Sequence, residues 1–489
     1  MQLLLHQIII NEFKSNGVVA ANDNLSSSLS ISSPIVMERN SPLSASSSPS
    51  SPTATTSTTQ SSVFDVLPSD CQWNMNSQYK HDRTMMFVTG KNDYLQLVAG
   101  EKVIYDFTCH LDQQLKFSLD DVIHIANGDN HSIFLTSDGK AFGIGSNTQG
   151  QLGEFNVEFG VLFEIKIKQS KRGRITKVAC GSFHSIILNS DGSIWVTGDN
   201  SFHQLGIEVD HLKCFTKVEF QQDSPISHIS TSYSHTLCYS ERDNILYSMG
   251  TTFGDDTEYF TPHRLTFFDD KDFKLTSVNA GYRYSAFLTS NHTVYIMGKI
   301  EKYNVFEPTQ LNLFEPLVQV FSGGKHLFLK TISNQFYGLG MNDDKQLPFS
   351  KVITGTIEPQ LLQLPTHEQV SDMAAGSYHT ALTTSSGNIY VCGWSELGQT
   401  GLGKNTITAD CTPLSLDPSV VLDISRGTTS VKLFLSSSAD NSFILLKRAH
   451  NIGRFYCRLF HSVLSCNSLC DVKIISHPAD HTATTEAKK

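Results

Sequence analysis

From about residue 85 onward, the chain alternates short apolar runs with short polar turns that are rich in glycine. In one segment, an apolar run at 133–135 is followed by Asp138-Gly139 and then by a second apolar run at 141–144. Runs this short favour strands over helices, and Asp-Gly favours a hairpin because glycine adopts a positive φ at little cost. The pattern therefore predicts antiparallel strands joined by tight turns.

Two half-patterns recur along this region, each in seven copies. The first is an apolar strand, Gly-x-x-His and a second apolar strand; it is found at 125–136, 178–189, 229–240, 278–289, 320–331 and 373–384, with a worn copy at 424–435. The second is an apolar strand followed by Gly-x-Asn and Gln-Leu-Gly, and its first glycine stands at positions 90, 145, 198, 250, 298, 340 and 393. These glycines are 42 to 55 residues apart, a spacing that matches one blade of a β-propeller rather than a helical repeat.

The order of the halves predicts how the ring closes. The repeat region opens with a copy of the second half-pattern at 87–97 and ends with a copy of the first at 424–435. Each of these copies lacks its other half, so the two complete one blade if they pair in space. Six whole blades and this shared blade predict an all-β, seven-bladed β-propeller over residues 85–447. Closure removes the open sheet edges that would otherwise favour aggregation.

The glycine-rich stretch GIGSNTQGQLG at 143–153 resembles nucleotide-binding loops but departs from both common motifs. The dinucleotide motif requires a third glycine where Thr148 stands, and the phosphate-binding loop requires a lysine where Gln151 stands. Because the stretch recurs around the predicted ring, we interpret Gly145, Asn147 and Gly150 as turn residues of a blade.

Composition limits the classes of function. The chain has 489 residues and a formal net charge of −10 at pH 7, which argues against general affinity for nucleic acid. Its ten cysteines follow no regular framework, and no apolar run is long enough to span a bilayer. We therefore expect a cytoplasmic or nuclear protein without membrane insertion.

The N-terminal region differs from the repeats in composition. Residues 25–62 are dominated by Ser, Thr and Pro, which cannot bury enough apolar surface to offset the entropy of ordering. Residues 1–80 are therefore predicted to be disordered. Four Ser-Pro pairs, at Ser33, Ser41, Ser48 and Ser51, are candidate sites for a proline-directed kinase, although a plain linker is the simpler interpretation.

The two half-patterns together resemble the regulator-of-chromosome-condensation repeat. The fullest copies run from Ala126 to Gly153, from Ala179 to Gly206 and from Ala375 to Gly401. The resemblance covers about residues 85–447 and implies a seven-bladed propeller, in agreement with the count of blades. The founding member of the family is a nucleotide exchange factor for the Ran GTPase, so the resemblance also implies a small GTPase as a candidate partner.

This chain departs from the family pattern in two respects. The N-terminal region carries almost no Lys or Arg, whereas the founding member binds chromatin through a basic tail. In the fourth and fifth repeats Tyr284 replaces the histidine, and Lys299-Ile300 stands where the residues after the glycine of Gly-x-Asn are expected. No exchange residue of the family is carried over to this chain.

The repeated histidines and two charged segments are the candidate functional residues. The histidines (His131, His184, His235, His326 and His379) stand at the same place in separate blades, which predicts a structural role in hydrogen bonding to nearby backbone. Charged loops on a rigid propeller suit protein recognition, because electrostatics set encounter rate and specificity. The candidate partner-binding residues are Lys166, Lys168, Lys171, Arg172 and Arg174 in a basic segment, and Asp255, Asp256, Asp269 and Asp270 in an acidic one. A merely solvated loop is the alternative for the basic segment.

The tail at 448–489 is predicted to hold a helix and a strand. Its Cys457, His461, Cys466 and Cys470 lack the close cysteine pair that anchors most zinc sites, so no metal is expected. The same segment resembles the opening of a BTB dimerisation domain, which some propellers of this family carry.

The sequence thus favours a non-enzymatic protein-interaction platform with no catalytic residues and no cofactor. Two alternatives stay open: a guanine-nucleotide exchange factor for a small GTPase, and an adaptor with a truncated BTB-like C-terminus.

Overall fold

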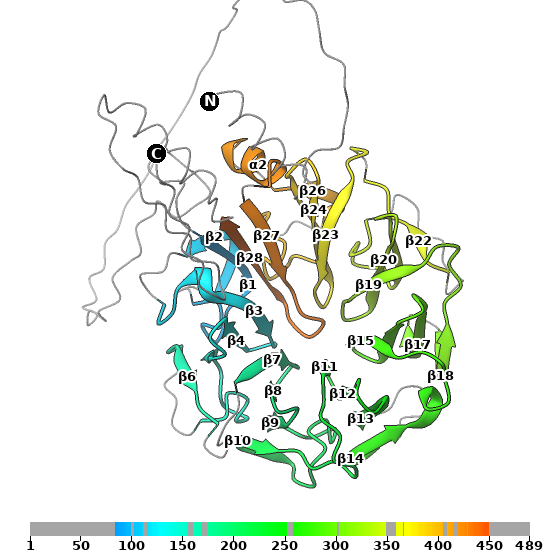
Figure 1. Ribbon diagram of the computed structural model, residues 1–489. Helices are drawn as coiled ribbons and strands as arrows, with labels where there is room; N and C mark the ends of the chain where they lie inside the picture. Colours follow the sequence, from blue (N-terminus) through cyan, green and yellow to red (C-terminus); the bar gives the residue numbers. More distant parts are fainter. Residues whose placement is uncertain are drawn as a thin grey trace, which may run out of the picture. The chain divides into compact units, whose positions relative to one another are not determined.

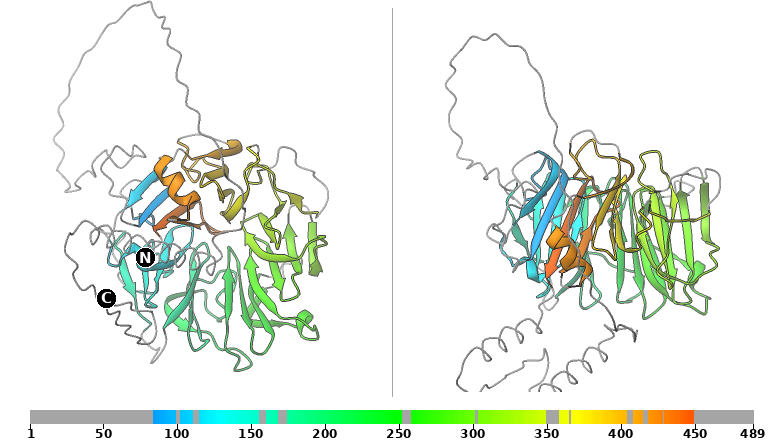
Figure 2. Two further views of the ribbon diagram at one scale, coloured as in Figure 1. Left: turned by 45° about the horizontal axis from the view of Figure 1, so that its top comes forward. Right: turned by 90° about the horizontal axis from the view of Figure 1, so that it is seen from above.

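The repeats form a ring of seven four-stranded antiparallel sheets around a central axis (Figure 1). The computed structural model describes residues 84–98, 102–110, 115–154, 160–167, 174–251, 258–300, 303–348, 358–364, 366–403, 408–414, 418–427 and 429–448. The sheets stand side by side with their strands along the thickness of the ring (Figure 2). The predicted all-β, seven-bladed propeller is confirmed. The predicted disorder of 1–80 and the Ser-Pro pairs lie outside the described residues.

Six blades are formed by consecutive strands. Blade 1 contains β3 (Val122–Asn127), β4 (His131–Thr136), β5 (Ala141–Gly145) and β6 (Phe163–Ile165). Blade 2 contains β7 (Ile175–Cys180), β8 (His184–Asn189), β9 (Ile194–Asp199) and β10 (His211–Lys217). Blade 3 contains β11 (His228–Thr231), β12 (His235–Ser240), β13 (Ile245–Thr251) and β14 (Glu258–Leu265).

The other consecutive blades follow the same order. Blade 4 contains β15 (Leu275–Ala280), β16 (Tyr284–Thr289), β17 (Val294–Ile300) and β18 (Tyr303–Gln310). Blade 5 contains β19 (Leu317–Ser322), β20 (His326–Thr331), β21 (Phe336–Gly340) and β22 (Gln360–Leu361). Blade 6 contains β23 (Val370–Ala375), β24 (His379–Thr384), β25 (Ile389–Gly393) and β26 (Thr408–Pro413). The short helices are η3 (Leu119–Asp121), η4 (Thr266–Phe268) and α2 (Pro418–Ser425).

Blade 7 is shared between the two ends of the repeat region, as the order of half-patterns predicted. It contains β1 (Met85–Lys91), β2 (Val103–His110), β27 (Thr429–Phe434) and β28 (Asn441–Arg448), in the order β2-β1-β28-β27. β1 runs antiparallel to β28 from Met85 opposite Leu446 to Gly90 opposite Asn441. The ring is therefore closed by backbone hydrogen bonds between segments more than 300 residues apart in sequence.

The predicted position of the worn first half is wrong. Residues 424–435 begin at the end of helix α2 instead of in a strand, and the two strands of this half are β27 and β28. Between them, Ser438-Ala439-Asp440-Asn441 takes the place of Gly-x-x-His. This loop contains neither the glycine nor the histidine of the pattern, so its sequence resembles an ordinary polar turn. Gly427, which follows helix α2, was mistaken for the glycine of the pattern.

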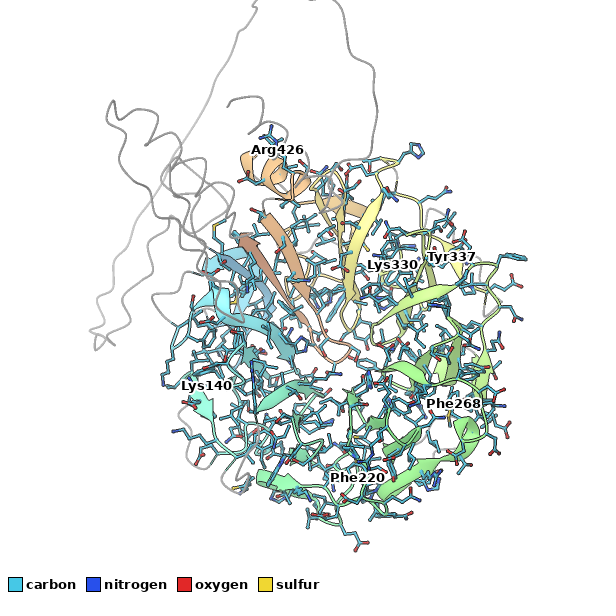
Figure 3. The ribbon with its side chains drawn as sticks, viewed as in Figure 1. Lys140, Phe220, Phe268, Lys330, Tyr337 and Arg426 are labelled. Atoms are coloured by element: carbon cyan, nitrogen blue, oxygen red, sulfur yellow. The ribbon has the colours of Figure 1, made fainter. Side chains whose placement is uncertain are left out.

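The core lies between neighbouring blades, because each apolar cluster combines buried side chains from two adjacent sheets. Figure 3 shows the side chains of the described residues around the ring. Phe134 of blade 1 meets Phe443 of blade 7 edge to face, with ring centroids 5.7 Å apart. In the outer part of the ring, the ring centroid of Phe268 lies 5.3 Å from that of Phe287 and 5.5 Å from that of Tyr295. Among the described residues, no helix has the length and apolar composition that crossing a membrane requires.

The repeated histidines connect each blade to the next one. Every one of the five is fully or almost fully buried, and its Nε2 atom lies within hydrogen-bonding distance of a hydroxyl on the following blade. The pairs are His131–Ser185 (2.8 Å), His184–Thr231 (2.6 Å), His235–Ser285 (3.3 Å), His326–Thr380 (3.0 Å) and His379–Ser442 (2.8 Å). Their role is therefore structural, but the partner of Nε2 is a side chain of the next blade and not the nearby backbone that the sequence suggested.

The glycine of the Gly-x-x-His pattern makes room for the histidine ring. A Cβ at Gly128 would lie 2.3 Å from Cε1 of His131, and one at Gly376 would lie 2.2 Å from Cε1 of His379. No side chain fits at that distance, so glycine and histidine recur together because the ring lies directly over the glycine.

Tyr284 shows what happens when the next blade offers no hydroxyl. The residue after the histidine in blade 5 is Leu327, which is fully buried. The longer Tyr284 side chain instead donates its hydroxyl to backbone, with Gly323 O at 2.9 Å and His326 O at 2.7 Å. The departure from the repeat at Tyr284 is thus matched to Leu327.

This match predicts a rescue between the two positions. Tyr284→His should lower the free energy of unfolding by about 2 kcal/mol, because the buried imidazole then faces an apolar side chain. Adding Leu327→Thr should recover part of that loss by supplying the hydroxyl present in other blades. Urea unfolding of the two single variants and the double variant measures the coupling; strictly additive losses would contradict the pairing.

Candidate protein-binding face

The two ends of the blades carry different loops, which defines two faces of the ring. The Gly-x-x-His loops and the turns after the third strands lie at one end, here called the loop face. The Asp-Gly hairpins and the connections between blades lie at the other end, here called the hairpin face. Gly139 of one such hairpin has φ +80°, as the Asp-Gly pattern predicts.

On the loop face, the Gly-x-x-His loops of different blades meet around the axis. Ser437 donates a hydrogen bond to Ser232 across the ring (3.0 Å), and Ser438 donates to Cys180 O (3.2 Å). The hydroxyl oxygens of Tyr282 and Ser377 are 2.8 Å apart, which joins blades 4 and 6. The axis is therefore filled by polar loops that hold one another in place.

A pocket of about 540 Å³ opens between these loops. Its lining comes from blades 1, 3, 4, 5 and 6, so it lies near the axis of the ring. The lining side chains with polar or charged ends are Asp129, Tyr233, Tyr282, Arg283, Lys299, Lys325 and Tyr378. Propeller loops are held by rigid sheets, which makes a pocket of this kind well ordered before any partner arrives.

In blades 1, 2, 5, 6 and 7, the turn after the third strand contacts the next blade. The turn is fixed internally by Asn147, whose Oδ1 accepts from Leu152 N at 2.8 Å; Asn92, Asn200 and Asn342 repeat this bond. Carbonyl groups of these turns accept hydrogen bonds from hydroxyls of the next blade. Examples are Thr197 to Gly150 O (2.7 Å) and Ser442 to Gln399 O (2.8 Å). We call this element the clasp turn.

Blade 4 has a short hairpin where the clasp turn stands in blades 1, 2, 5, 6 and 7. β17 pairs with β18 as far as Ile300 opposite Tyr303, so only two residues connect the strands. The pocket lies beside this hairpin, with Lys299 on one side and Gly324, Lys325 and Met341 of blade 5 on the other. The departure of Lys299-Ile300 from the repeat therefore lies at the pocket, which Lys299 lines.

Five aromatic rings form a continuous arc across the same face. Successive ring centroids are 5.5 to 5.9 Å apart in the order Phe202, Tyr233, Tyr282, Tyr378 and Trp394. Three of the contacts are edge to face, a favourable geometry for aromatic pairs. Tyr233 is 43% exposed, so the arc offers apolar surface to a partner. We call these residues the aromatic arc.

Asp129 lines the pocket, and the carboxyl group of Asp440 lies close enough to influence it. Burial and then the charge of Asp440 raise the pKa of Asp129 to about 7, against an opposing effect from Lys91. Burial also raises the pKa of Asp440, again opposed by Lys91. Close to neutral pH, part of the Asp129 population is therefore uncharged. The cations of the lining are Arg283 and Lys299, which are exposed, and Lys325, which is half-buried.

The basic segment predicted as a binding site lies on the hairpin face where it is described. Lys166 is exposed, and Arg174 is exposed immediately before β7. The aliphatic part of Arg174 packs on Gly139 of blade 1, where a Cβ would lie 2.0 Å from Arg174 Cγ. Lys168, Lys171 and Arg172 lie outside the described residues. The structure thus gives Arg174 a packing role, and neither Lys166 nor Arg174 lines the pocket.

The acidic segment is divided by strand β14. Asp255 and Asp256, before β14, lie outside the described residues, whereas Asp269 and Asp270 follow β14 on the hairpin face. Asp269 forms an ion pair with Arg264 at 3.0 Å, and Asp270 is exposed. Within the described part of the chain, no group of three or more His, Cys, Asp or Glu side chains is arranged to hold a metal.

Sequence reasoning missed the pocket, although two signals for it were visible. In three of the loops that correspond to Gly-x-x-His, one of the two variable positions is a tyrosine: Tyr233, Tyr282 or Tyr378. Lys299 stands at the point where the second half-pattern breaks down. Both features looked like erosion of a structural repeat, and only the closed ring places them side by side.

Comparison with known proteins agrees with this architecture. Two family models described as the regulator of chromosome condensation (RCC1) repeat match the chain, one at residues 122–151, 175–204 and 370–399 and the other at 138–188. Prp20p from Saccharomyces cerevisiae has the same fold, with a TM-score of 0.62 and 17% identity over 78% of this chain and 96% of that chain. Fold and repeats together define a seven-bladed propeller built from these units. The matched segments of this chain, within 122–204 and at 370–399, are RCC1 repeats.

Two relatives share about a quarter of their residues with this chain over the matched segments. The human X-linked retinitis pigmentosa GTPase regulator is 27% identical over 315 residues, which cover 60% of this chain and 30% of that protein. The bovine secretion-regulating guanine nucleotide exchange factor is 26% identical over 361 residues, or 65% of this chain and 76% of that protein. The chain thus spans less than a third of the length of the human relative. The BTB-like start expected at 448–489 lies outside the described residues, apart from Arg448 at the end of β28, and neither family model extends to it.

Proposed function

We propose that this protein is a non-enzymatic protein-interaction platform in the cytoplasm or nucleus, and that it binds a protein partner on the loop face. The observation that carries the proposal is the loop-face pocket, where cations of blades 4 and 5 adjoin the aromatic arc. Aromatic residues and arginine in a preformed pocket are the side chains that dominate binding energy at protein interfaces. The repeat core around them supplies rigidity.

A matched pair of charge reversals tests this proposal. Lys299→Glu changes the pocket, and Lys166→Glu makes the same change on the hairpin face; both lysines are exposed, so neither substitution should lower stability by more than about 0.5 kcal/mol. Proteins that bind the tagged full chain are compared for the two variants and the wild type by quantitative mass spectrometry. We expect specific partners to fall at least fivefold with Lys299→Glu alone. Loss of the same partners only with Lys166→Glu would move the interface to the hairpin face.

The second candidate function is guanine-nucleotide exchange on a small GTPase. It is favoured by the relatives, two of which are a GTPase regulator and an exchange factor, and by Prp20p, a protein studied for its binding to Gsp1p and histones. The test is release of a fluorescent GDP from a panel of purified small GTPases with the full chain added. Acceleration of one GTPase, abolished by Lys299→Glu or by Lys166→Glu, would establish exchange and locate the contact.

A further inference from the structure

Resting on the proposed function, we propose that the loop-face pocket binds an acidic peptide segment of a partner, with carboxylates at Arg283, Lys299 and Lys325 and an apolar or aromatic side chain on the aromatic arc. The partner is thus identified by chemistry: a short, extended or looped segment in which Asp or Glu alternates with large apolar residues.

The charge distribution of the pocket favours an anion. Three cations from two neighbouring blades line it, whereas Asp129 is the one carboxyl group of the described lining. The raised pKa of Asp129, about 7, removes part of its negative charge near neutral pH. Lys325 also interacts with Asp344, whose pKa is raised by burial and by Asp343.

The aromatic arc supplies the apolar half of the recognition. The ammonium group of Lys325 lies 5.0 Å from the centroid of the Tyr378 ring, so cation and ring form one surface. A ligand that pairs with Lys325 is thereby brought against Tyr378 and its neighbour Tyr282. A peptide with both acidic and apolar side chains satisfies the two halves together, whereas a purely acidic segment leaves the rings without a contact.

Size and ring geometry distinguish a peptide from the other occupants. A volume of about 540 Å³ accommodates a few side chains, which suits an inserted segment. Single-stranded nucleic acid would need open ring faces along a basic track. Here Tyr282 meets Tyr378 at 77° and Tyr378 meets Trp394 at 80°, so neighbouring rings cover one another by edge-to-face contact. The chain also carries a formal net charge of −10.

The missing clasp turn explains why the site lies at blade 4. In blade 7, where the clasp turn is present, the side chain of Gln96 in that turn reaches the Gly-x-x-His loop of blade 1. Gln96 Nε2 lies 3.1 Å from Asp129 O. At blade 4 the two-residue hairpin leaves the corresponding space beside Gly324 and Lys325 open. The partner segment would occupy the place that a clasp turn fills elsewhere in the ring.

Fluorescence anisotropy with a defined probe tests the inference on the full chain. The probe is a fluorescein-labelled peptide of alternating glutamate and phenylalanine, compared with peptides in which glutamine replaces glutamate or alanine replaces phenylalanine. We expect saturable binding of the probe, at least tenfold weaker binding of both comparison peptides, and further weakening at high salt. Lys299→Glu and, separately, Arg283→Glu should weaken probe binding more than tenfold, while Lys166→Glu should stay within twofold.

Each contrary result has a separate meaning. If the probe does not bind but Lys299→Glu still removes cellular partners, the inference fails and the proposed function stands. If the probe binds equally to wild type and Lys299→Glu, or if an oligothymidine of similar length displaces it completely, the acidic-peptide site is wrong. Thermal unfolding of every variant is measured in parallel, so that loss of binding is assigned only to variants as stable as the wild type.

Discussion

Removing β1 by deleting residues 85–98 is expected to prevent the ring from closing and to abolish cooperative unfolding of the propeller. β1 is an interior strand of its sheet, hydrogen-bonded to β2 on one side and β28 on the other. It buries Met86, Phe87 and Val88, and Leu97 is buried in the turn that follows. At about 1.5–3 kcal/mol for each large apolar side chain, their loss alone approaches the 5–15 kcal/mol that stabilises an ordinary domain.

The control for this deletion removes residues 1–80 and leaves β1 intact. We expect the control to melt within a few degrees of the full chain, because the predicted disorder of that region contributes no core. The measurement is differential scanning calorimetry together with urea unfolding. If the 85–98 deletion melts at the same temperature as the control, the two ends of the repeat region do not form the latch described above.

Acidification from pH 7.5 to 5.5 is expected to destabilise the propeller by several kcal/mol, before most carboxylates are protonated. Burial is the largest cause that lowers the pKa of the blade-connecting histidines, to about 3 for His131, His326 and His379 and about 4 for His184. Burial also lowers the pKa of His235 well below its ordinary value. These side chains are therefore neutral in the folded protein over the whole of this range.

The sign of the effect follows from where protons bind. Between the folded values and the ordinary value of 6.5, the unfolded chain binds more protons, so stability is fully present above pH 6.5 and falls as pH decreases. At pH 5.5 each histidine costs about 1.4 kcal/mol, or on the order of 7 kcal/mol for five. Asp129 opposes this, because its folded pKa of about 7 is raised and its protonated form is favoured in the folded state. The net loss expected is on the order of 5 kcal/mol.

Urea unfolding at pH 7.5, 6.5 and 5.5 measures this dependence. His379→Gln keeps a polar group beside Ser442 but removes one titrating site, so its loss between pH 6.5 and 5.5 should be about 1 kcal/mol smaller than that of the wild type. Asp129→Asn should make the loss larger, because the opposing group is gone. A free energy of unfolding that stays constant from pH 7.5 to 5.5 would show that the histidines are not buried in the neutral form.

The fold was predictable because the repeat marks its own backbone geometry. The glycine of the second half-pattern has a positive φ in every blade, from 92° at Gly250 to 110° at Gly90 and Gly340. A Cβ at Gly145 would lie 2.5 Å from Asn130 O, so no other residue fits there without movement. Constraints of this kind are local, and they recur often enough to count the blades. The worn copy in blade 7 was misplaced because it carries neither the glycine nor the histidine.

The candidate site was not predictable in the same way. Clusters of charge in sequence pointed to the connections around Lys166 and Asp269, yet Arg174 packs against a neighbouring hairpin and Asp269 pairs with Arg264. The pocket combines residues from five blades, and their proximity depends on closure of the ring and not on any local spacing. Lys299 looked like repeat erosion because a missing turn becomes informative only when its neighbours are known.

Site-specific photo-crosslinking is the measurement that tests the loop-face account most directly. A photoreactive amino acid is placed at position 299 in one variant and at position 166 in another, and both full chains are irradiated in cells. The account predicts that position 299 crosslinks a defined partner through a segment rich in acidic and large apolar residues, and that position 166 does not. The account would be contradicted if only position 166 formed crosslinks, or if position 299 crosslinked no protein.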